Sequence, residues 1–101
     1  PEAIRRPCLA GFIVVTHSDP ALAEERMAAR PAHLENLDRM RERGQLLNAG
    51  PLADGSGAVL IYTVPDRGVL ERLIEADPYP KTAVQVASVR EWEPNYHHHV
   101  C

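Results

Sequence analysis

The sequence predicts a single α+β domain in which strands and helices follow one another in the order β-α-β-β-α-β. Three observations lead to this prediction. Short runs rich in branched apolar residues, which are typical of strands, occur at Leu9 to Thr16 and at Ala58 to Val64. Two segments bounded by turn residues carry apolar residues at helical spacing. The length of 101 residues is that of one ordinary domain.

The first helical segment follows the strand at 9–16. Asp19 is a good N-cap, and Pro20 fits the first helical position because its missing N–H would be unpaired there anyway. The helix is expected to run to about Arg43 and to end at Gly44. Pro31 removes a hydrogen bond and clashes with the preceding turn, so we expect a kink or a restart there.

The second half of the chain repeats this alternation. Gln45 to Ala49 is a short strand, and the Gly- and Pro-rich segment 50–57 is a turn. The strand at 58–64 follows, and Asp66 then caps a helix that runs to about Ala76. Thr82 to Trp92 is the last strand.

This order is the ferredoxin-like arrangement. Two helices cover only one face of a four-stranded sheet. The first and third strands, however, are apolar almost without alternation, which indicates burial on both faces. The economical cover for the second face is another copy of the sheet, so we expect a symmetric homodimer.

Composition narrows the classes of partner. The net charge is −3, and basic residues such as Arg26, Arg30 and Arg39 are spread out as on a solvated helix face, so no nucleic-acid partner is expected. No apolar run approaches the ~20 residues that cross a bilayer, and no signal peptide is visible. We therefore expect a cytoplasmic protein with no membrane partner, in which Cys8 and Cys101 are free thiols rather than a disulfide.

His33 is the most informative position. On a helix it shares an apolar stripe with Leu37 and Met40 and faces the sheet. It is either a core histidine held by one hydrogen bond or a general base in a cavity between helix and sheet. Asp77 is either a turn residue before Pro78 or a carboxylate that orients the imidazole. Sequence spacing alone does not bring it to His33.

The remaining candidates have ordinary explanations as well. Asp54 and Ser56 lie in a glycine-rich hairpin turn, where such residues are common, and no phosphate-binding glycine loop is present. His17 ends the first strand, where a pocket mouth could lie, but we favour a simple loop residue. Adjacent histidines at 97–99, with Cys101, point in different directions along an extended tail. They are natural tail residues, a cloning remnant or an adventitious metal site, and no functional metal is expected.

Several short motifs resemble the YciI-like proteins, which are small dimeric α+β barrel domains. The resemblance covers about residues 9 to 92, leaves a tail at 93–101, and depends on the order and spacing of four motifs: Arg30 to Leu34, Ala49 to Leu52, Ala76 to Tyr79 and Val89 to Trp92. Two features depart from the family. Pro80 to Ala83 replaces a stretch that usually holds a small residue or glycine, and the histidine-rich tail is not a family feature.

The resemblance implies an enzyme in which His33 and Asp77 are the catalytic pair. It implies proton transfer on a small cyclic or aromatic substrate without a cofactor, as a lyase that dehydrochlorinates a chlorinated hydroxyhydroquinone in aromatic degradation, or as an isomerase. A non-catalytic small-molecule binding module and a purely structural dimer remain as alternatives. The substrate contacts expected beside the pair are Asp54, Ser56, Tyr79 and His17.

Overall fold

A four-stranded antiparallel sheet forms the base of the fold. The computed structural model describes residues 9–93. The strands are β1 (Ala10–Ser18), β2 (Leu46–Pro51), β3 (Gly57–Val64) and β4 (Val84–Trp92). Their order in the sheet is β2-β3-β1-β4, with every neighbouring pair antiparallel. This is the ferredoxin-like topology, so the predicted α+β fold class is confirmed.

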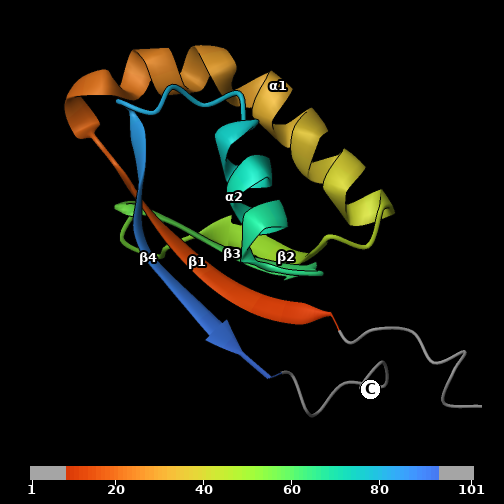
Figure 1. Ribbon diagram of the computed structural model, residues 1–101. Helices are drawn as coiled ribbons and strands as arrows, with labels where there is room; N and C mark the ends of the chain where they lie inside the picture. Colours follow the sequence, from red (N-terminus) through yellow and green to blue (C-terminus); the bar gives the residue numbers. More distant parts are fainter. Residues whose placement is uncertain (1–8, 94–101) are drawn as a thin grey trace, which may run out of the picture.

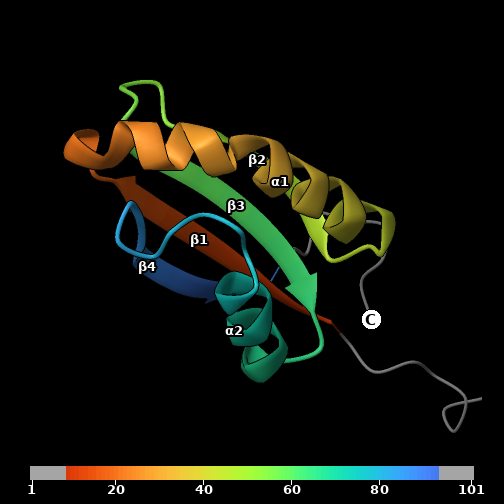
Figure 2. The same ribbon diagram turned by 90° about the horizontal axis from the view of Figure 1, so that it is seen from above.

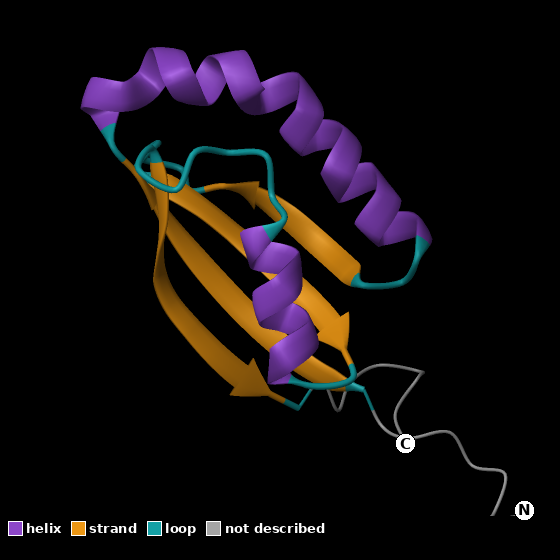
Figure 3. Ribbon diagram, turned by 45° about the horizontal axis from the view of Figure 1, so that its top comes forward, coloured by secondary structure: helices purple, strands orange, loops and turns teal. Residues whose placement is uncertain are grey.

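Both helices lie on one face of this sheet (Figure 1). A 3-10 turn, η2 (Pro20–Leu22), leads into α1 (Ala23–Glu42), and α2 (Arg67–Glu75) follows β3. Figure 2, viewed from above, shows both helices in front of the sheet, and Figure 3 shows the same layering. Neither helix of the described part of the chain is long and apolar enough to cross a membrane.

Asp66 and Gly44 lie at helix ends as predicted, whereas Asp19 caps the 3-10 turn η2, and α1 itself begins after Leu22 without a side-chain cap. The Asp19 carboxylate accepts a hydrogen bond from the Ala21 N–H, and the Asp66 carboxylate accepts one from the Val69 N–H. Gly44 follows the last turn of α1 at φ 75°, the left-handed conformation that glycine adopts most readily. Capping residues therefore mark the start of η2, the start of α2 and the end of α1.

Strand ends differ from the expectation where pairing or turns override local composition. β1 runs on to Ser18 because its ladders with β3 and β4 continue past Thr16. β2 likewise extends to Pro51. The expected start of β4 at Thr82 is wrong: the N–H groups of Ala83 and Val84 both donate to the Pro80 carbonyl, and this turn delays the strand.

Of the two outcomes expected at Pro31, a kink or a restart, the restart does not occur. The α-helix continues from Ala23 to Glu42 with Pro31 inside it, and its ribbon bends near the middle (Figure 1). Pro31 and Met27, one turn earlier, are both solvent-exposed. The carbonyl that loses its partner to the proline therefore lies on the water side, where water can satisfy it and where helices bend most readily.

The two helices cover the sheet unequally. In α2, Leu70 is fully buried against the core strands. In α1 the only buried residue is Met40, near the C-terminal end, whereas Leu34 is 40% exposed and Met27 is 52% exposed. α1 thus packs at its end and leaves space beneath its middle.

The outer face of the sheet is apolar and has no described element over it. Ile13 pairs with Ile61, and Val15 with Val59, on the side away from the helices. Each of these side chains is half-buried by its neighbours. The two-sided apolar pattern of β1 and β3 is therefore present in the fold, and one of its faces lacks a second layer within residues 9–93.

One glycine is required by close backbone approach. A Cβ at Gly57 would collide with the carbonyl oxygen of Thr16, which lies beside it in β1. The Thr16 hydroxyl also accepts the N–H of Ala58 at 3.1 Å, so the backbones are held together at this point. By contrast, nothing lies within 4 Å of a Cβ built at Gly50.

We expect Gly57→Ala to lower the free energy of unfolding by about 1–3 kcal/mol, because the added methyl group must displace strand backbone. Gly50→Ala is the matched control and should leave the stability unchanged or slightly raised. Urea unfolding of both variants measures the difference, and equal values for the two would contradict the steric argument.

Candidate active site

A cavity of about 660 Å³ lies between α1 and the sheet. Its floor includes Val14, Leu60 and Tyr62 of β1 and β3. α1 supplies one wall, and the connection between α2 and β4 supplies residues at another side. The cavity thus occupies the space that α1 leaves by packing only at its end.

His33 and Asp77 meet beside this cavity. The imidazole Nδ1 of His33 lies 2.8 Å from one carboxylate oxygen of Asp77 and 3.0 Å from the other. The two side chains are 13% and 15% exposed. Both residues line the cavity. The two residues are 44 positions apart in the chain, and the fold makes them neighbours by setting α1 above the end of α2.

The Asp77 carboxylate is held in place by its own turn. It accepts the backbone N–H of Tyr79 at 2.9 Å. The ammonium group of Lys81 donates to the carbonyl oxygens of Ile74 at 2.9 Å and of Asp77 at 3.1 Å, which satisfies the end of α2. The turn that carries the Asp77 carboxylate is therefore held by hydrogen bonds on both sides of Asp77.

This contact determines which nitrogen of His33 is free. An ionised carboxylate only accepts hydrogen bonds, so Nδ1 carries the hydrogen toward Asp77. In a neutral imidazole Nε2 then holds the lone pair. Tyr79 stacks on the ring with centroids 3.9 Å apart and planes inclined by 17°, which restricts the imidazole further. The arrangement can accept a proton at Nε2 while the carboxylate stabilises the resulting cation.

Tyr62 on the cavity floor was not predicted from the sequence. It is only 2% exposed. Burial, and in second place the negative charge of Asp77, raise the pKa of the Tyr62 phenol above its ordinary value. Tyr62 therefore stays protonated and presents a phenol to the cavity. Its position on an apolar strand gave no sign of this, because only the three-dimensional fold places it near Asp77.

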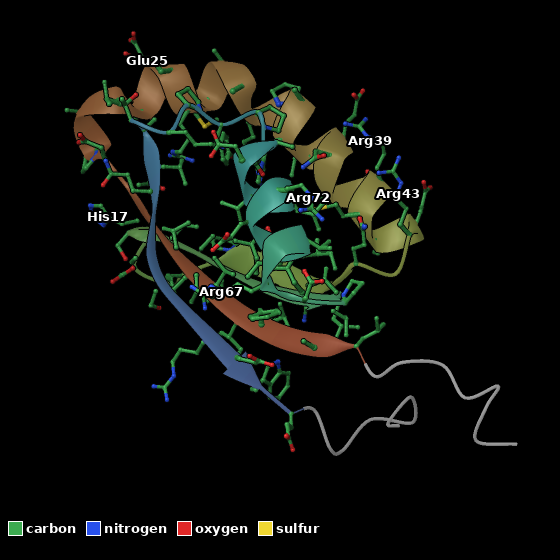
Figure 4. All side chains as sticks on the ribbon, in the orientation of Figure 1. His17, Glu25, Arg39, Arg43, Arg67 and Arg72 are labelled. Carbon is green, nitrogen blue, oxygen red and sulfur yellow. The ribbon has the colours of Figure 1, made fainter. Side chains whose placement is uncertain are left out.

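Two arginines expected on a solvated face border the cavity. Arg30 is exposed, as expected, whereas Arg26 is half-buried. Glu25, Arg39 and Arg43 do lie on the outer side of α1 (Figure 4). The helical spacing of Arg26 and Arg30 to His33, seven and three residues, was the signal that could have identified them.

Three of the expected substrate contacts lie outside the cavity. The Asp54 carboxylate accepts the Ser56 hydroxyl at 2.7 Å and the Ser56 N–H at 2.9 Å, and these bonds lower the pKa of the exposed Asp54 side chain. Neither residue lines the cavity, although Gly55 and Gly57 do. The side chains of Asp54 and Ser56 are instead bonded to each other within the turn.

His17 is also placed away from the pair. Strand alternation turns Thr16 and Ser18 toward the cavity and His17 away from it. The exposed His17 side chain, labelled in Figure 4, borders a separate and smaller pocket. Of the four expected contacts, Tyr79 alone lies in the cavity.

No group of three or more potential metal ligands occurs within residues 9–93. The histidines at 97–99 and both cysteines lie outside the described residues.

The raised pKa of Tyr62 predicts a loss of stability in alkali. Above pH ~10 an unfolded tyrosine ionises while folded Tyr62 does not, so the free energy of unfolding falls by up to ~1.4 kcal/mol per pH unit. Tyr62→Phe should remove this part of the slope. Unfolding measured between about pH 8 and 11 checks it, with Phe12→Leu as a control that lowers stability at every pH. A Tyr62→Phe slope equal to that of the wild type would contradict the assignment.

Comparisons with known proteins show the family and the fold to which the chain is similar. The chain is 26% identical to the protein YciI of Escherichia coli O6:H1, over 72% of this chain and 85% of that protein, and a YciI of Shigella flexneri matches equally. It is also similar in structure to the 5-chloro-2-hydroxyhydroquinone dehydrochlorinase TftG of Burkholderia phenoliruptrix AC1100, solved in complex with 2,5-dihydroxybenzoquinone. That likeness has a TM-score of 0.71 at 20% identity and covers 82% of this chain and 93% of the other.

At this identity the structural likeness shows a shared fold. The family is shown by a separate match, because the model of the YCII-related domain covers residues 10–93, nearly the whole chain. The chain therefore belongs to the family of proteins with a YCII-related domain.

Proposed function

We propose that this protein is a small enzyme that uses His33 and Asp77 to move a proton on a small cyclic or aromatic compound without a cofactor. One observation carries the proposal: the imidazole–carboxylate pair, 2.8 Å apart, borders a cavity of about 660 Å³. A histidine retained for packing would sit in a filled core. An oriented imidazole facing open space is what a general base requires.

In the proposed reaction Nε2 of His33 takes a proton from a ring hydroxyl or a ring carbon. Asp77 holds the imidazole by Nδ1 and stabilises its cation. In the lyase version, the ring oxygen that has lost its proton becomes a carbonyl, and the chlorine-bearing carbon takes up the proton from the His33 imidazolium. A second ring hydroxyl then loses its proton, its oxygen becomes the second carbonyl, and chloride leaves the tetrahedral carbon with its bonding pair. The substrate loses HCl in total, and its ring is oxidised at the expense of the carbon–chlorine bond, so no external oxidant is needed.

The ring substrate is supported by two features. Apolar side chains such as Val14, Leu37 and Leu60 line the cavity, and they suit a flat, partly apolar molecule. The structural neighbour is a dehydrochlorinase of a hydroxylated chloroaromatic compound. An isomerase would use the same pair and return the proton to another ring atom. A binding module would hold the same ligand without turnover, and an activity assay distinguishes it from either enzyme.

The proposal includes a homodimer. The outer face carries Ile13, Val15, Val59 and Ile61, which pair side by side, and Leu47 on β2 is 42% exposed. An apolar patch of this kind on a sheet marks an interaction surface. A second copy provides a self-complementary cover related by a two-fold axis.

His33→Ala should reduce turnover of a chlorinated hydroxyhydroquinone by about 10²- to 10⁴-fold, because a positioned base contributes that much. Asp77→Asn should reduce it less, because its role is orientation and charge. Chloride release measures turnover, and circular dichroism checks the fold. Asp38→Asn, an exposed carboxylate on α1, is the control and should keep full activity. Normal turnover by His33→Ala would place the base elsewhere.

Light scattering at micromolar concentration should give twice the protomer mass of 11.2 kDa. Ile61→Lys should yield monomers, because it places a charge in the proposed contact. The exposed substitution Ala32→Lys on α1 should leave the dimer intact. A wild-type protein that is monomeric at this concentration would refute the dimer and would leave the catalytic proposal standing.

A further inference from the structure

We infer that the natural ligand of this cavity carries a carboxylate group, which Arg26 and Arg30 bind while the rest of the molecule reaches His33. The inference rests on the proposed function in placing the reacting part of the ligand at His33. The anion site itself depends only on the two arginines. The ligand of the structural neighbour, 2,5-dihydroxybenzoquinone, has no carboxylate group, so the inference goes beyond that likeness.

The first observation is position. Arg26, Arg30 and His33 follow one another at intervals of four and three residues, so they share one face of α1. All three line the cavity. The rise from Arg30 to His33 is ~4.5 Å along the helix, which is comparable to the reach from a carboxylate to the far side of the ring that bears it.

The second observation is an unpaired donor. The Nε atom of Arg26 is buried and has no hydrogen-bond partner among the described residues. An orphaned buried N–H is destabilising, and buried polar groups are nearly always paired. A ligand oxygen in the cavity would supply the missing acceptor.

The third observation is the contrast with three arginines that lie outside the cavity. Arg39, Arg41 and Arg67 each lie within 4 Å of a carboxylate one turn away on their own helix. Within residues 9–93, neither Arg26 nor Arg30 forms such a pair. Ion pairs therefore occupy three arginines outside the cavity, whereas Arg26 and Arg30, which line it, form none within residues 9–93.

The charges that line the cavity leave an excess of positive charge at this wall. Asp77 is engaged by His33, and the Lys81 ammonium group by two carbonyls. Glu75 is the remaining acidic residue of the lining, so one negative charge stands against the two positive charges of Arg26 and Arg30. Guanidinium groups bind planar two-oxygen acceptors with paired hydrogen bonds, which is the geometry of a carboxylate.

Binding of benzoate and of benzamide, measured by calorimetry, tests the inference with two ligands that differ in the anionic group. Benzoate should bind the wild type about 10- to 100-fold more tightly, because hydrogen bonds between charged groups contribute that much. Arg26→Met and Arg30→Met should each reduce the preference. Arg39→Met, the same change on the outer side of α1, should keep it. Equal binding of the two ligands by the wild type, or equal losses in all three variants, would overturn the inference.

Arg26→Met has a second readout that a merely structural arginine would not give. Methionine keeps an unbranched apolar stem and removes the unpaired donor, so the melting temperature of the free protein should stay level or rise while benzoate binding weakens. A lower melting temperature with the benzoate preference intact would make Arg26 structural. A larger effect of the arginine variants on 2,5-dihydroxybenzoquinone than on benzoate would show that ring oxygens, and not a carboxylate, are bound.

This test is independent of the proposed catalysis. His33→Ala should retain the preference for benzoate, since the anion is bound by other side chains. A protein that prefers benzoate but never turns over a ring substrate would refute the proposed enzyme and keep the anion site. Turnover of a ring substrate without any preference for benzoate would refute the anion site and keep the proposed enzyme.

Discussion

The contact between the His33 imidazole and the Asp77 carboxylate is the interaction on which the rest of the site depends. It joins the middle of α1 to the turn after α2, two elements that otherwise have little reason to lie at a fixed distance. α1 buries only Met40 in the core, so its middle is positioned by this pair and by the stacking of Tyr79 on the imidazole. The interaction that orients a candidate base also holds one wall of its cavity.

The cavity follows from an uneven division of packing. α2 and the inner faces of β1 and β3 form a dry core around Phe12, Val64 and Leu70, and this part of the fold provides hydrophobic stabilisation. The half of the sheet under α1 forgoes such packing and retains open volume. Polar and charged groups therefore line the cavity: Tyr62 lies at the floor as a protonated phenol, and the oriented imidazole of His33 lies at one side. Along the helix lie two guanidinium groups that form no ion pair within residues 9–93. The open volume under α1 therefore both reduces the hydrophobic packing of this half of the sheet and gives a ligand access to these polar groups.

The sequence by itself determined the order of elements, the start of α2 and the end of α1. Asp19, Asp66 and Gly44 act on backbone groups within a few residues, so their effect is readable without a fold. Apolar periodicity predicted that His33 faces the sheet, and the unbroken apolar character of β1 and β3 predicted a sheet that is apolar on both faces. The family resemblance added the pairing of His33 with Asp77, which spacing alone did not supply.

Only the tertiary structure decided what these residues face. The distance between α1 and the sheet made His33 a cavity residue instead of a core residue, and no local pattern encodes that distance. The 44-residue separation of His33 and Asp77 is closed by the crossing of two helices over one sheet. Long-range placement also brought Tyr62 and Arg26 to the site and left Asp54, Ser56 and His17 outside it. Local chemistry acts over one turn of chain, whereas a site is assembled from elements that topology brings together.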